Sequence, residues 1–391
     1  MLPHILLFLF AITSQAKDLQ IHFFNVGGAD SQLIVFPSGY SILIDAGEPV
    51  GGSSTIGGAG TNGKYIANRI YKILGKKKVD VFLLSHFHCD HSGYHNQGGI
   101  WYLIEKAGFT FGKFLHRNIG KYQGQKLTDC TKNSIKWLFA GAVSTATWKF
   151  VCYATSSVEK TKLSKIAQVA YRCSTTQINP PDADTTAQII IRDAYGVIDK
   201  NTNKFLNRNS MAEKHPVNEN DFSICLKINF GKFGYCTCGD LSGYDTVIKE
   251  SSTSLYHDVE TSVAPMIGEV DLMKVNHHGS SSSTNPTWAK TLRPTVAVSS
   301  CADDGAGMAK RGMTNLKNVN ATVYTTGKAE KTKGDSYFDS LIRMGDDVVV
   351  KVPENGDSFT VSNSQGKNKR TFKIKQNKKS AVKCHALEDD V

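Results

Sequence analysis

Short runs of hydrophobic residues, separated by turns rich in Gly, Pro and Asn, indicate that this chain is built largely from β-strands. Three closely spaced runs near the N-terminus predict a β-meander over residues 19–25, 31–36 and 41–45. A helix is predicted next over residues 64–74, because isoleucines recur there at helical spacing and Gly75 can end the last turn. Residues 79–84 follow as a hydrophobic strand that we expect to be buried.

The second half of the chain repeats this pattern of strands and turns. Further strands are predicted at residues 223–229 and 232–238, which form a hairpin, and at 271–275, 347–352 and 358–362. The pattern is weakest over residues 117–210, where we expect one helix at 157–171 and interpret the whole interval as an insertion or lid. Two β-rich halves predict an α+β fold in which two sheets pack face to face with helices outside.

Composition places the chain among folded, exported proteins. It has 391 residues, of which 40% are hydrophobic and 21% charged, and this is too hydrophobic for a disordered chain. An apolar run at residues 5–12 precedes Ser14 and Ala16, a pattern that predicts a signal peptide over residues 1–16 and a secreted mature protein. No later stretch approaches the ~18 apolar residues of a membrane span. Nine cysteines suit an oxidising compartment, and the odd number leaves at least one thiol unpaired.

The charge balance favours anionic partners. The chain has 46 Lys and Arg against 35 Asp and Glu, a net charge of +11. Residues 363–391 hold eight of the basic residues and three of the acidic ones, so this C-terminal tail is strongly basic. We expect the tail to be a solvated segment, with a docking arm for a polyanion as the alternative. The predicted domains are therefore the leader, a main domain over residues 17–362, and the tail.

The strongest chemical signal is a cluster of metal-binding residue types directly after the strand at residues 79–84. Four potential ligands lie within six residues, in the order His86, His88, Asp90 and His91. Imidazole and carboxylate groups are the ligands that zinc, manganese and iron bind in proteins, and a loop at a strand end can curl so that such side chains converge. The pattern therefore predicts a metal site.

This His-x-His-x-Asp-His motif resembles the signature of the metallo-β-lactamase superfamily, which are hydrolases with an αββα sandwich and one or two metal ions between the sheets. The resemblance covers about residues 19–362, with the middle interval unmatched. Asp45, at the end of the third strand, resembles the family's early aspartate and would orient the metal loop. Cys238-Gly239-Asp240 resembles the segment whose carboxylate bridges two metals, and the run from Asn276 to Ser280 resembles the last metal-binding loop.

Two branches of that superfamily are the most similar. They are the nuclease domain of the competence DNA-uptake channel and the choline-binding phosphorylcholine esterase. The segment from Phe24 to Ser31 resembles the start of the competence family, although Gly28 stands where that family usually has Gln. His88 stands where the competence nucleases often have Asp, so the metal site looks more like that of the esterase and implies a dinuclear pair.

The resemblance implies a ligand set for two divalent ions, zinc or manganese. One ion would take His86, His88 and a further histidine, for which His215 and His116 are the alternatives. The other would take Asp90, His91 and His278, and Asp240 would bridge the two. Adjacent side chains on an extended segment point opposite ways, so we assign His278 to metal and His277 to the substrate phosphate or a proton transfer, with the reverse as the alternative.

This ligand set implies hydrolysis by a metal-bound hydroxide, with Asp90 and Asp240 at the reacting centre and His277 protonating the leaving group. Nucleic acid is the first expected substrate, because the resemblance and the positive charge both favour phosphodiesters. Small phosphodiesters of the phosphorylcholine type come second, and the same fold also serves carboxylic esters, lactones and lactams. The alternative to an enzyme is a non-catalytic protein that binds polyanions through its tail.

Overall fold

The computed structural model describes residues 18–49, 60–118, 145–156, 160–191, 196–198, 205–207, 219–251, 254–305 and 308–384. The predicted signal peptide lies outside these residues. Among the helices in the described part, none is both long and apolar enough to cross a bilayer.

The first sheet has nine strands in the order β20-β19-β18-β1-β2-β3-β4-β5-β6. Its strands are β1 (Leu19–Phe23), β2 (Ser31–Val35), β3 (Ser41–Ala46), β4 (Lys78–Leu83), β5 (Thr110–His116), β6 (Ala167–Val169), β18 (Val348–Val352), β19 (Ser358–Asn363) and β20 (Arg370–Lys373). The predicted meander is confirmed, because β1, β2 and β3 pair antiparallel in sequence order. From β3 onward the pairing is parallel, and helices α1 (Asn62–Leu74) and α3 (Ile100–Glu105) make the crossovers.

The second sheet has seven strands in the order β17-β16-β15-β14-β11-β10-β7. Its strands are β7 (Thr185–Ile190), β10 (Cys225–Phe230), β11 (Phe233–Thr237), β14 (Leu272–Lys274), β15 (Val296–Ser299), β16 (Thr322–Thr325) and β17 (Ile342–Arg343). The predicted hairpin is formed by β10 and β11, which turn at Gly231. Beyond it, β11, β14, β15, β16 and β17 run parallel.

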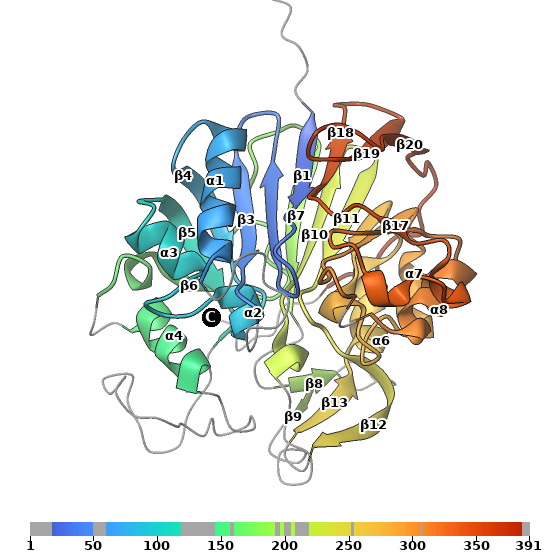
Figure 1. Ribbon diagram of the computed structural model, residues 1–391, viewed down its shortest axis with the longest axis horizontal. Coiled ribbons are helices and arrows are strands. Elements are labelled where there is room, and N and C mark those ends of the chain that lie inside the picture. The colour runs from blue at the N-terminus through green and yellow to red at the C-terminus, as the bar shows by residue number, and fades with distance from the viewer. Residues whose placement is uncertain are drawn as a thin grey trace, which may run out of the picture.

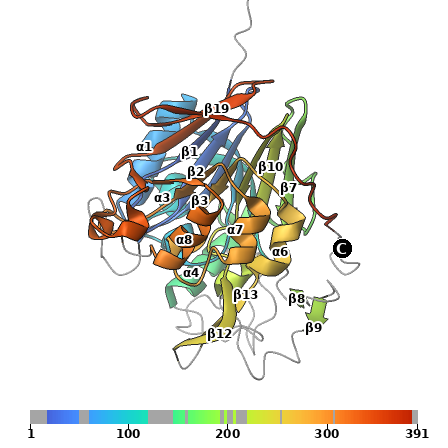
Figure 2. The ribbon, with the colours of Figure 1, turned by 90° about the vertical axis from the view of Figure 1, so that its right-hand side faces the viewer.

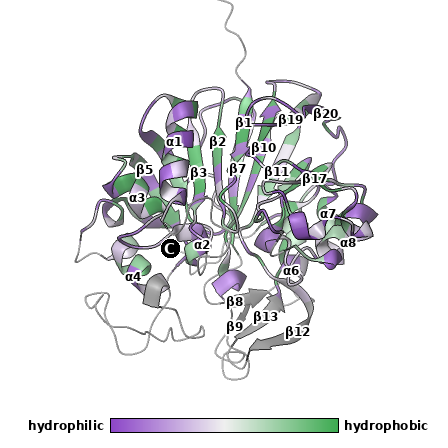
Figure 3. Cartoon of the chain, in the orientation of Figure 1, coloured by the Kyte–Doolittle hydropathy of each residue, from purple (hydrophilic) through white to green (hydrophobic). Residues whose placement is uncertain are grey.

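The two sheets pack face to face with helices on both outer faces, so the expected αββα sandwich is confirmed (Figures 1 and 2). Strand β3 shows how alternation builds these layers: Ile42 and Ile44 enter the core between the sheets, whereas Leu43 packs in the outer cluster with Ile66 and Ile70 of α1. Burying each such side chain stabilises the fold by roughly 1.5–3 kcal/mol. Figure 3 shows the hydrophobic colour concentrated on the strands at the centre of the molecule.

The helices of the second outer layer are amphipathic and cover the other sheet. They are α6 (Glu260–Ile267), α7 (Pro286–Leu292) and α8 (Lys310–Asn318). Their buried side chains, among them Val263, Trp288 and Leu316, form one cluster with Met273 of β14. The remaining helices and strands are α2 (Cys89–Ser92), α4 (Thr145–Thr155), β8 (Gly196–Ile198), β9 (Phe205–Asn207), β12 (Gly243–Ser251) and β13 (Ser254–Asp258), together with short 3₁₀ turns, among them η2 (Ser164–Ile166), η3 (Glu219–Phe222) and η4 (Asn276–Gly279).

The middle of the chain differs from its sequence interpretation. The helix expected at residues 157–171 is wrong: α4 ends at Thr155, and the described residues beyond it form η2 and strand β6. Residues 167–169 form a strand instead of a helix because they pair with residues 114–116 of β5. The interpretation of residues 117–210 as an insertion or lid stays a prediction; among the described residues of this interval, β6 is an edge strand of the first sheet and β7 an edge strand of the second.

The C-terminal tail is largely part of the folded body. Strand β20 pairs with β19, Ile374 is buried, and Lys378 forms an ion pair with Asp271 at 2.8 Å. A disulfide joins Cys384 to Cys173. Residues 370–384 are therefore attached to the folded body by sheet pairing and a crosslink, while most of their side chains are exposed, as expected for a solvated segment.

Candidate metal centre

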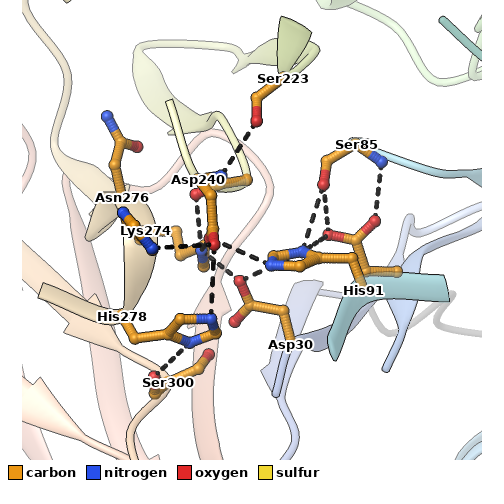
Figure 4. Close-up of polar contacts among 12 residues, drawn as sticks. Asp30, Ser85, His91, Ser223, Asp240, Lys274, Asn276, His278 and Ser300 are labelled. Carbon is orange, nitrogen blue, oxygen red and sulfur yellow. Dashed lines mark hydrogen bonds and ion pairs between the residues drawn. The ribbon is translucent and has the colours of Figure 1, made fainter. Parts of the chain in front are cut away.

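The metal-binding residue types of both halves of the chain meet at one edge of the sandwich. Asp45 is on β3, the motif beginning at His86 follows β4, Asp240 follows β11 and His278 follows β14. Because β3 and β4 are parallel, and so are β11 and β14, the carboxyl ends of these strands lie at a common edge of each sheet. The site is thus built from loops of both sheets (Figure 4).

Four buried residues at this edge form a cluster that could hold a metal ion. Asp30, His91, Asp240 and His278 each offer one ligand atom, and these atoms lie within 4.8 Å of one another. Two of the four belong to the first sheet's loops and two to those of the second. A cation bound here would therefore tie the two layers together.

His91 is held with one nitrogen directed at Asp240. Its Nδ1 lies 2.7 Å from Asp45 Oδ2, and the Asp45 carboxylate also accepts the backbone N–H of Ser85 at 2.7 Å. The Asp45 carboxylate therefore keeps the proton of His91 on Nδ1, as an outer carboxylate does for a metal-binding histidine. Nε2, the nitrogen available to a metal, then faces Asp240 Oδ1 at 3.1 Å.

His278 is fixed in the same way by a backbone group. Its Nδ1 donates to the carbonyl oxygen of Ser300 at 2.9 Å, which leaves the Nε2 lone pair free to bind metal. Nε2 lies 3.5 Å from Asp90 Oδ2 and 3.7 Å from Asp240 Oδ2. We call Asp90, His91 and His278 the His278 side of the centre.

The His278 side is strongly cation-attracting. Burial disfavours the charged imidazolium, but Asp240 and Asp45 outweigh burial and raise the pKa of His91 well above its usual range. Burial likewise opposes ionisation of Asp90, yet the interaction with His278, whose Nε2 lies 3.5 Å from Asp90 Oδ2, lowers the pKa of that carboxyl to about 2. Among the described residues, His91 Nε2, His278 Nε2 and Asp240 Oδ1 are buried without a hydrogen-bond partner. A divalent ion in place of the imidazolium proton would satisfy these converging atoms.

His86 and His88 form the second group of imidazoles, which we call the His86 side. His86 Nε2 lies 3.0 Å from His88 Nδ1, and the His86 ring centroid lies 4.1 Å from that of His91. Burial and the neighbouring His91 lower the pKa of His86 well below its usual range. His86 is therefore neutral, which is the form that binds metal.

The third ligand of the His86 side stays a prediction. His215 lies outside the described residues. Its competitor His116 is buried, donates from Nδ1 to the carbonyl oxygen of Arg117 and packs against the rings of Phe87 and Phe114. Since a carbonyl oxygen only accepts, the proton of His116 is on Nδ1. Burial lowers the pKa of His116 to about 4.

Both His277 and His278 lie beside Asp240, although adjacent side chains of an extended segment would point in opposite directions. Nε2 of His277 and Nε2 of His278 are each 3.7 Å from Asp240 Oδ2. The two side chains reach the same carboxylate because both residues have a left-handed backbone conformation, with φ of 49° and 53°. His277 is the more accessible, with 19% of its side chain exposed, and its Nδ1 is 2.8 Å from Ser282 Oγ.

Two site residues had no role in the sequence analysis. Asp30 is in the metal-capable cluster, and the buried Lys274 forms an ion pair with it. The sequence does contain a signal for Lys274, because this charged residue lies inside the strand predicted at residues 271–275. Asp30 was inside the segment that resembles the competence family, but only the fold shows that the two side chains meet.

Comparisons with known proteins give only remote likenesses. No family model matches the chain, and no curated protein matches it. Among solved structures, a mutant of the CmlA β-hydroxylase is 12% identical (79% of this chain, 52% of that chain, TM-score 0.38). The metallo-β-lactamase fold protein YhfI from Bacillus subtilis is 11% identical (84% and 96%, TM-score 0.37).

Tm1679, described as a metal-dependent hydrolase of the β-lactamase superfamily, is 10% identical (79% and 96%, TM-score 0.40). This chain thus spans about half the length of the CmlA chain and nearly all of the other two. Because these TM-scores lie below 0.5, fold and function are argued from the chain's own residues.

Proposed function

We propose that this chain is a secreted, metal-dependent hydrolase that cleaves phosphodiesters, with nucleic acid as its preferred substrate. The observation that carries the proposal is the convergence of buried nitrogen and oxygen atoms of His91, His278 and Asp240, without hydrogen-bond partners, at the carboxyl ends of the strands. Such a donor set holds a divalent cation, and its mixture of imidazole and carboxylate suits zinc or manganese.

The ligands divide between two ions that share Asp240. Asp90, His91 and His278 would hold one, and His86 with His88 would hold the other, completed by His215 or His116. When bound, such ions supply a water acidic enough to act as a nucleophile near neutral pH and neutralise charge on the phosphoryl oxygens. The protein's part is to fix the imidazole tautomers and to keep Asp90 and Asp240 ionised.

His277 is our candidate for the proton that the leaving group needs. Its exposed fraction of 19% leaves it reachable from solvent, and Nε2 lies 3.4 Å from Asn220 Nδ2 as well as near Asp240. The hydroxyl of Ser282 contacts the other ring nitrogen. The exposure of His277 and its contacts beside Asp240 support it as the group that would transfer a proton to the leaving oxygen.

Charge and disulfides support the choice of substrate and compartment. The net charge of +11 concentrates polyanions near the protein. The disulfides Cys173–Cys384 and Cys225–Cys238 are typical of an oxidising compartment, which agrees with the predicted signal peptide.

A substrate panel tests the proposal. We expect single- or double-stranded DNA, RNA or bis-p-nitrophenyl phosphate to be hydrolysed with Mn²⁺ or Zn²⁺, and activity to be lost in His86→Ala and Asp240→Ala. Turnover of bis-p-nitrophenyl phosphate and phosphorylcholine esters without nucleic acid would favour the small-phosphodiester alternative. Turnover of only a penicillin, ester or lactone would contradict phosphodiester hydrolysis, and polyanion binding without any turnover would indicate a non-catalytic protein.

A further inference from the structure

A buried lysine lies directly behind the predicted bridging carboxylate. Lys274 is the last residue of β14, and its side chain has no exposed surface. Its Nζ forms an ion pair with Asp30, donates to the carbonyl oxygen of Gly239 at 2.9 Å and lies 4.0 Å from Asp240 Oδ1 (Figure 4). The lysine thus contacts the turn that delivers Asp240 and separates two carboxylates.

A buried ion pair of this kind contributes little net free energy to the stability of a fold. Removing two charged groups from water costs several kcal/mol per ion, and well-packed apolar replacements of buried pairs are often neutral or stabilising. The neighbours of Lys274 on the strand, Leu272 and Met273, are apolar and fully buried, so an apolar side chain would suit the position. The location of the pair beside the metal centre points to a role there.

The turn before Asp240 is tightly held on two sides. Gly239 is left-handed with φ of 54°, and a Cβ atom there would lie 2.5 Å from Ser85 Oγ, so the backbone of the second sheet touches the metal loop of the first. The backbone N–H of Asp240 donates to Ser223 Oγ at 3.2 Å, while Lys274 holds the carbonyl of Gly239. These contacts aim Oδ1 of Asp240 at His91 and Oδ2 at His278.

The ion pair with Lys274 also limits how the Asp30 carboxylate can take part in metal binding. Asp30 belongs to the metal-capable cluster, and its Oδ2 is 3.7 Å from His91 Nδ1. Because the ammonium group lies between Asp30 and Asp240, it offsets the repulsion between these two carboxylates. The same contact occupies the Asp30 carboxylate with a lysine.

We propose that Lys274 and Asp30 are positioning residues, whose ion pair fixes the Asp240 carboxylate between His91 and His278 and thereby sets the affinity of the centre for divalent metal. The inference rests on the proposed function, because it concerns the metal centre on which that function depends. The pair keeps Asp30 out of the coordination sphere and leaves Asp240 as the shared carboxylate.

The variant Lys274→Met separates positioning from simple charge. Loss of a positive charge beside a cation site strengthens metal binding if Lys274 acts through charge alone, or if Asp30 is a ligand that the lysine masks. If Lys274 is a positioning residue, the variant should instead bind Co²⁺ about 10- to 100-fold more weakly than wild type. Calorimetry with metal-free protein measures the affinity, and the visible absorption bands of the bound ion should change as well. Affinity and bands equal to wild type, or tighter binding, overturn the proposal.

The double variant Asp30→Asn/Lys274→Met guards against a failure to fold. Lys274→Met alone leaves Asp30 charged and unpaired, whereas the double variant keeps the net charge and removes the pair. We expect the double variant to melt close to wild type and still to bind Co²⁺ about 10- to 100-fold more weakly. Wild-type affinity in a folded double variant overturns the proposal.

Lys227→Met is the matched control. Lys227 is a half-buried lysine of β10 that donates to the carbonyl oxygen of Ile267, so its loss should lower stability without changing the Co²⁺ bands. The outcomes also separate the two proposals. Wild-type protein that binds Co²⁺ but hydrolyses nothing in the substrate panel contradicts the proposed function, whereas unchanged binding in the Lys274 variants contradicts only the positioning role.

Discussion

The two sides of the metal centre are fixed to very different degrees. On the His278 side, the non-binding nitrogens of His91 and His278 are held by Asp45 and by the carbonyl of Ser300. On the His86 side, Ser85 Oγ lies 3.1 Å from His86 Nδ1, but His86 Nε2 contacts Nδ1 of His88 at 3.0 Å. An ion on the His86 side must therefore break a contact between its own ligands, whereas the His278 side is preorganised. We infer that the His278 side binds metal more tightly.

The difference follows from where the supporting groups come from. Asp45, Ser300 and Lys274 lie on or directly after strands of the two sheets, whose geometry is set by the core. The His86 side depends on one loop and on a third ligand, for which His215 lies outside the described residues. Strand ends thus give one side a rigid outer layer of hydrogen bonds, and such layers tune metal affinity.

Replacing Asp240 should have the largest effect, because it is the one residue predicted to serve both sides. In Asp240→Ala we expect both ions to be lost, with a fall in affinity larger than the about 10- to 100-fold typical of losing an outer partner. Elemental analysis after dialysis checks metal content, and circular dichroism checks folding. Retention of two ions by the variant would contradict the bridging role.

Replacing one histidine on each side should reveal the asymmetry directly. His91→Ala should abolish tight binding, because the His278 side then loses a preorganised ligand. His88→Ala should remove only the weaker ion and leave the tight one in place. The measurement is the number of bound Mn²⁺ or Zn²⁺ ions at limiting metal, and equal losses in the two variants would contradict the comparison.

Asp45→Asn tests whether the Asp45 carboxylate is the reason that the His278 side is preorganised for metal. Asp45 is left-handed with φ of 57°, a conformation that Asn tolerates, so the fold should persist. The amide no longer holds the proton of His91 on Nδ1 as a carboxylate does, and we expect metal affinity to fall about 10- to 100-fold. Calorimetric titration measures this, and an unchanged affinity would show that Asp45 does not orient His91.

Glu260 supports the His278 loop and predicts a pH effect on stability. Its carboxylate accepts hydrogen bonds from Asn276, Thr284 and Asn285, yet burial raises the pKa of Glu260 from 4.5 to about 7. The folded state therefore binds more protons than the unfolded state between these values, and stability falls as pH rises through this window.

The matched variant for this effect is Glu260→Gln, which does not titrate. Between about pH 5 and about pH 8, wild type should lose about 2–3 kcal/mol of unfolding free energy relative to the variant. Urea denaturation of both proteins in the presence of a chelator measures the difference. Parallel pH dependence in the two proteins would contradict a raised pKa at Glu260.

The smallest effect is expected far from the centre, on the surface next to β20. Lys367 and Lys369 are exposed in the turn between β19 and β20. Replacing both with Gln should leave turnover of a small phosphodiester unchanged and reduce the slope of log affinity for DNA against log salt by about 1–2. An unchanged slope would show that this part of the basic tail does not contact polyanions.

The sequence was most informative where chemistry is local. The run from His86 to His91 has its ligand types within six residues, and the strands before it and around Asp240 have clear hydrophobic patterns. The αββα layers followed from the order of those strands. Asp45, at the end of a predicted strand, was identified through its resemblance to the early aspartate of the superfamily.

Sequence reasoning failed where distant contacts decide the geometry. The pair formed by Asp30 and Lys274 joins residues 244 positions apart and depends on the packing of two sheets. The directions of His277 and His278 depend on two left-handed residues that no local signal distinguishes from an extended strand end. Strand β20 was not predicted because it has little hydrophobic pattern, and only pairing with β19 reveals it as a strand.

The most direct test of this account is a calorimetric titration of metal-free wild-type protein with Mn²⁺ or Zn²⁺. The geometry predicts two binding steps, a tight one on the His278 side and a weaker one on the His86 side, with only the weaker step absent in His88→Ala. Failure of folded wild-type protein to bind either ion would contradict the metal centre itself.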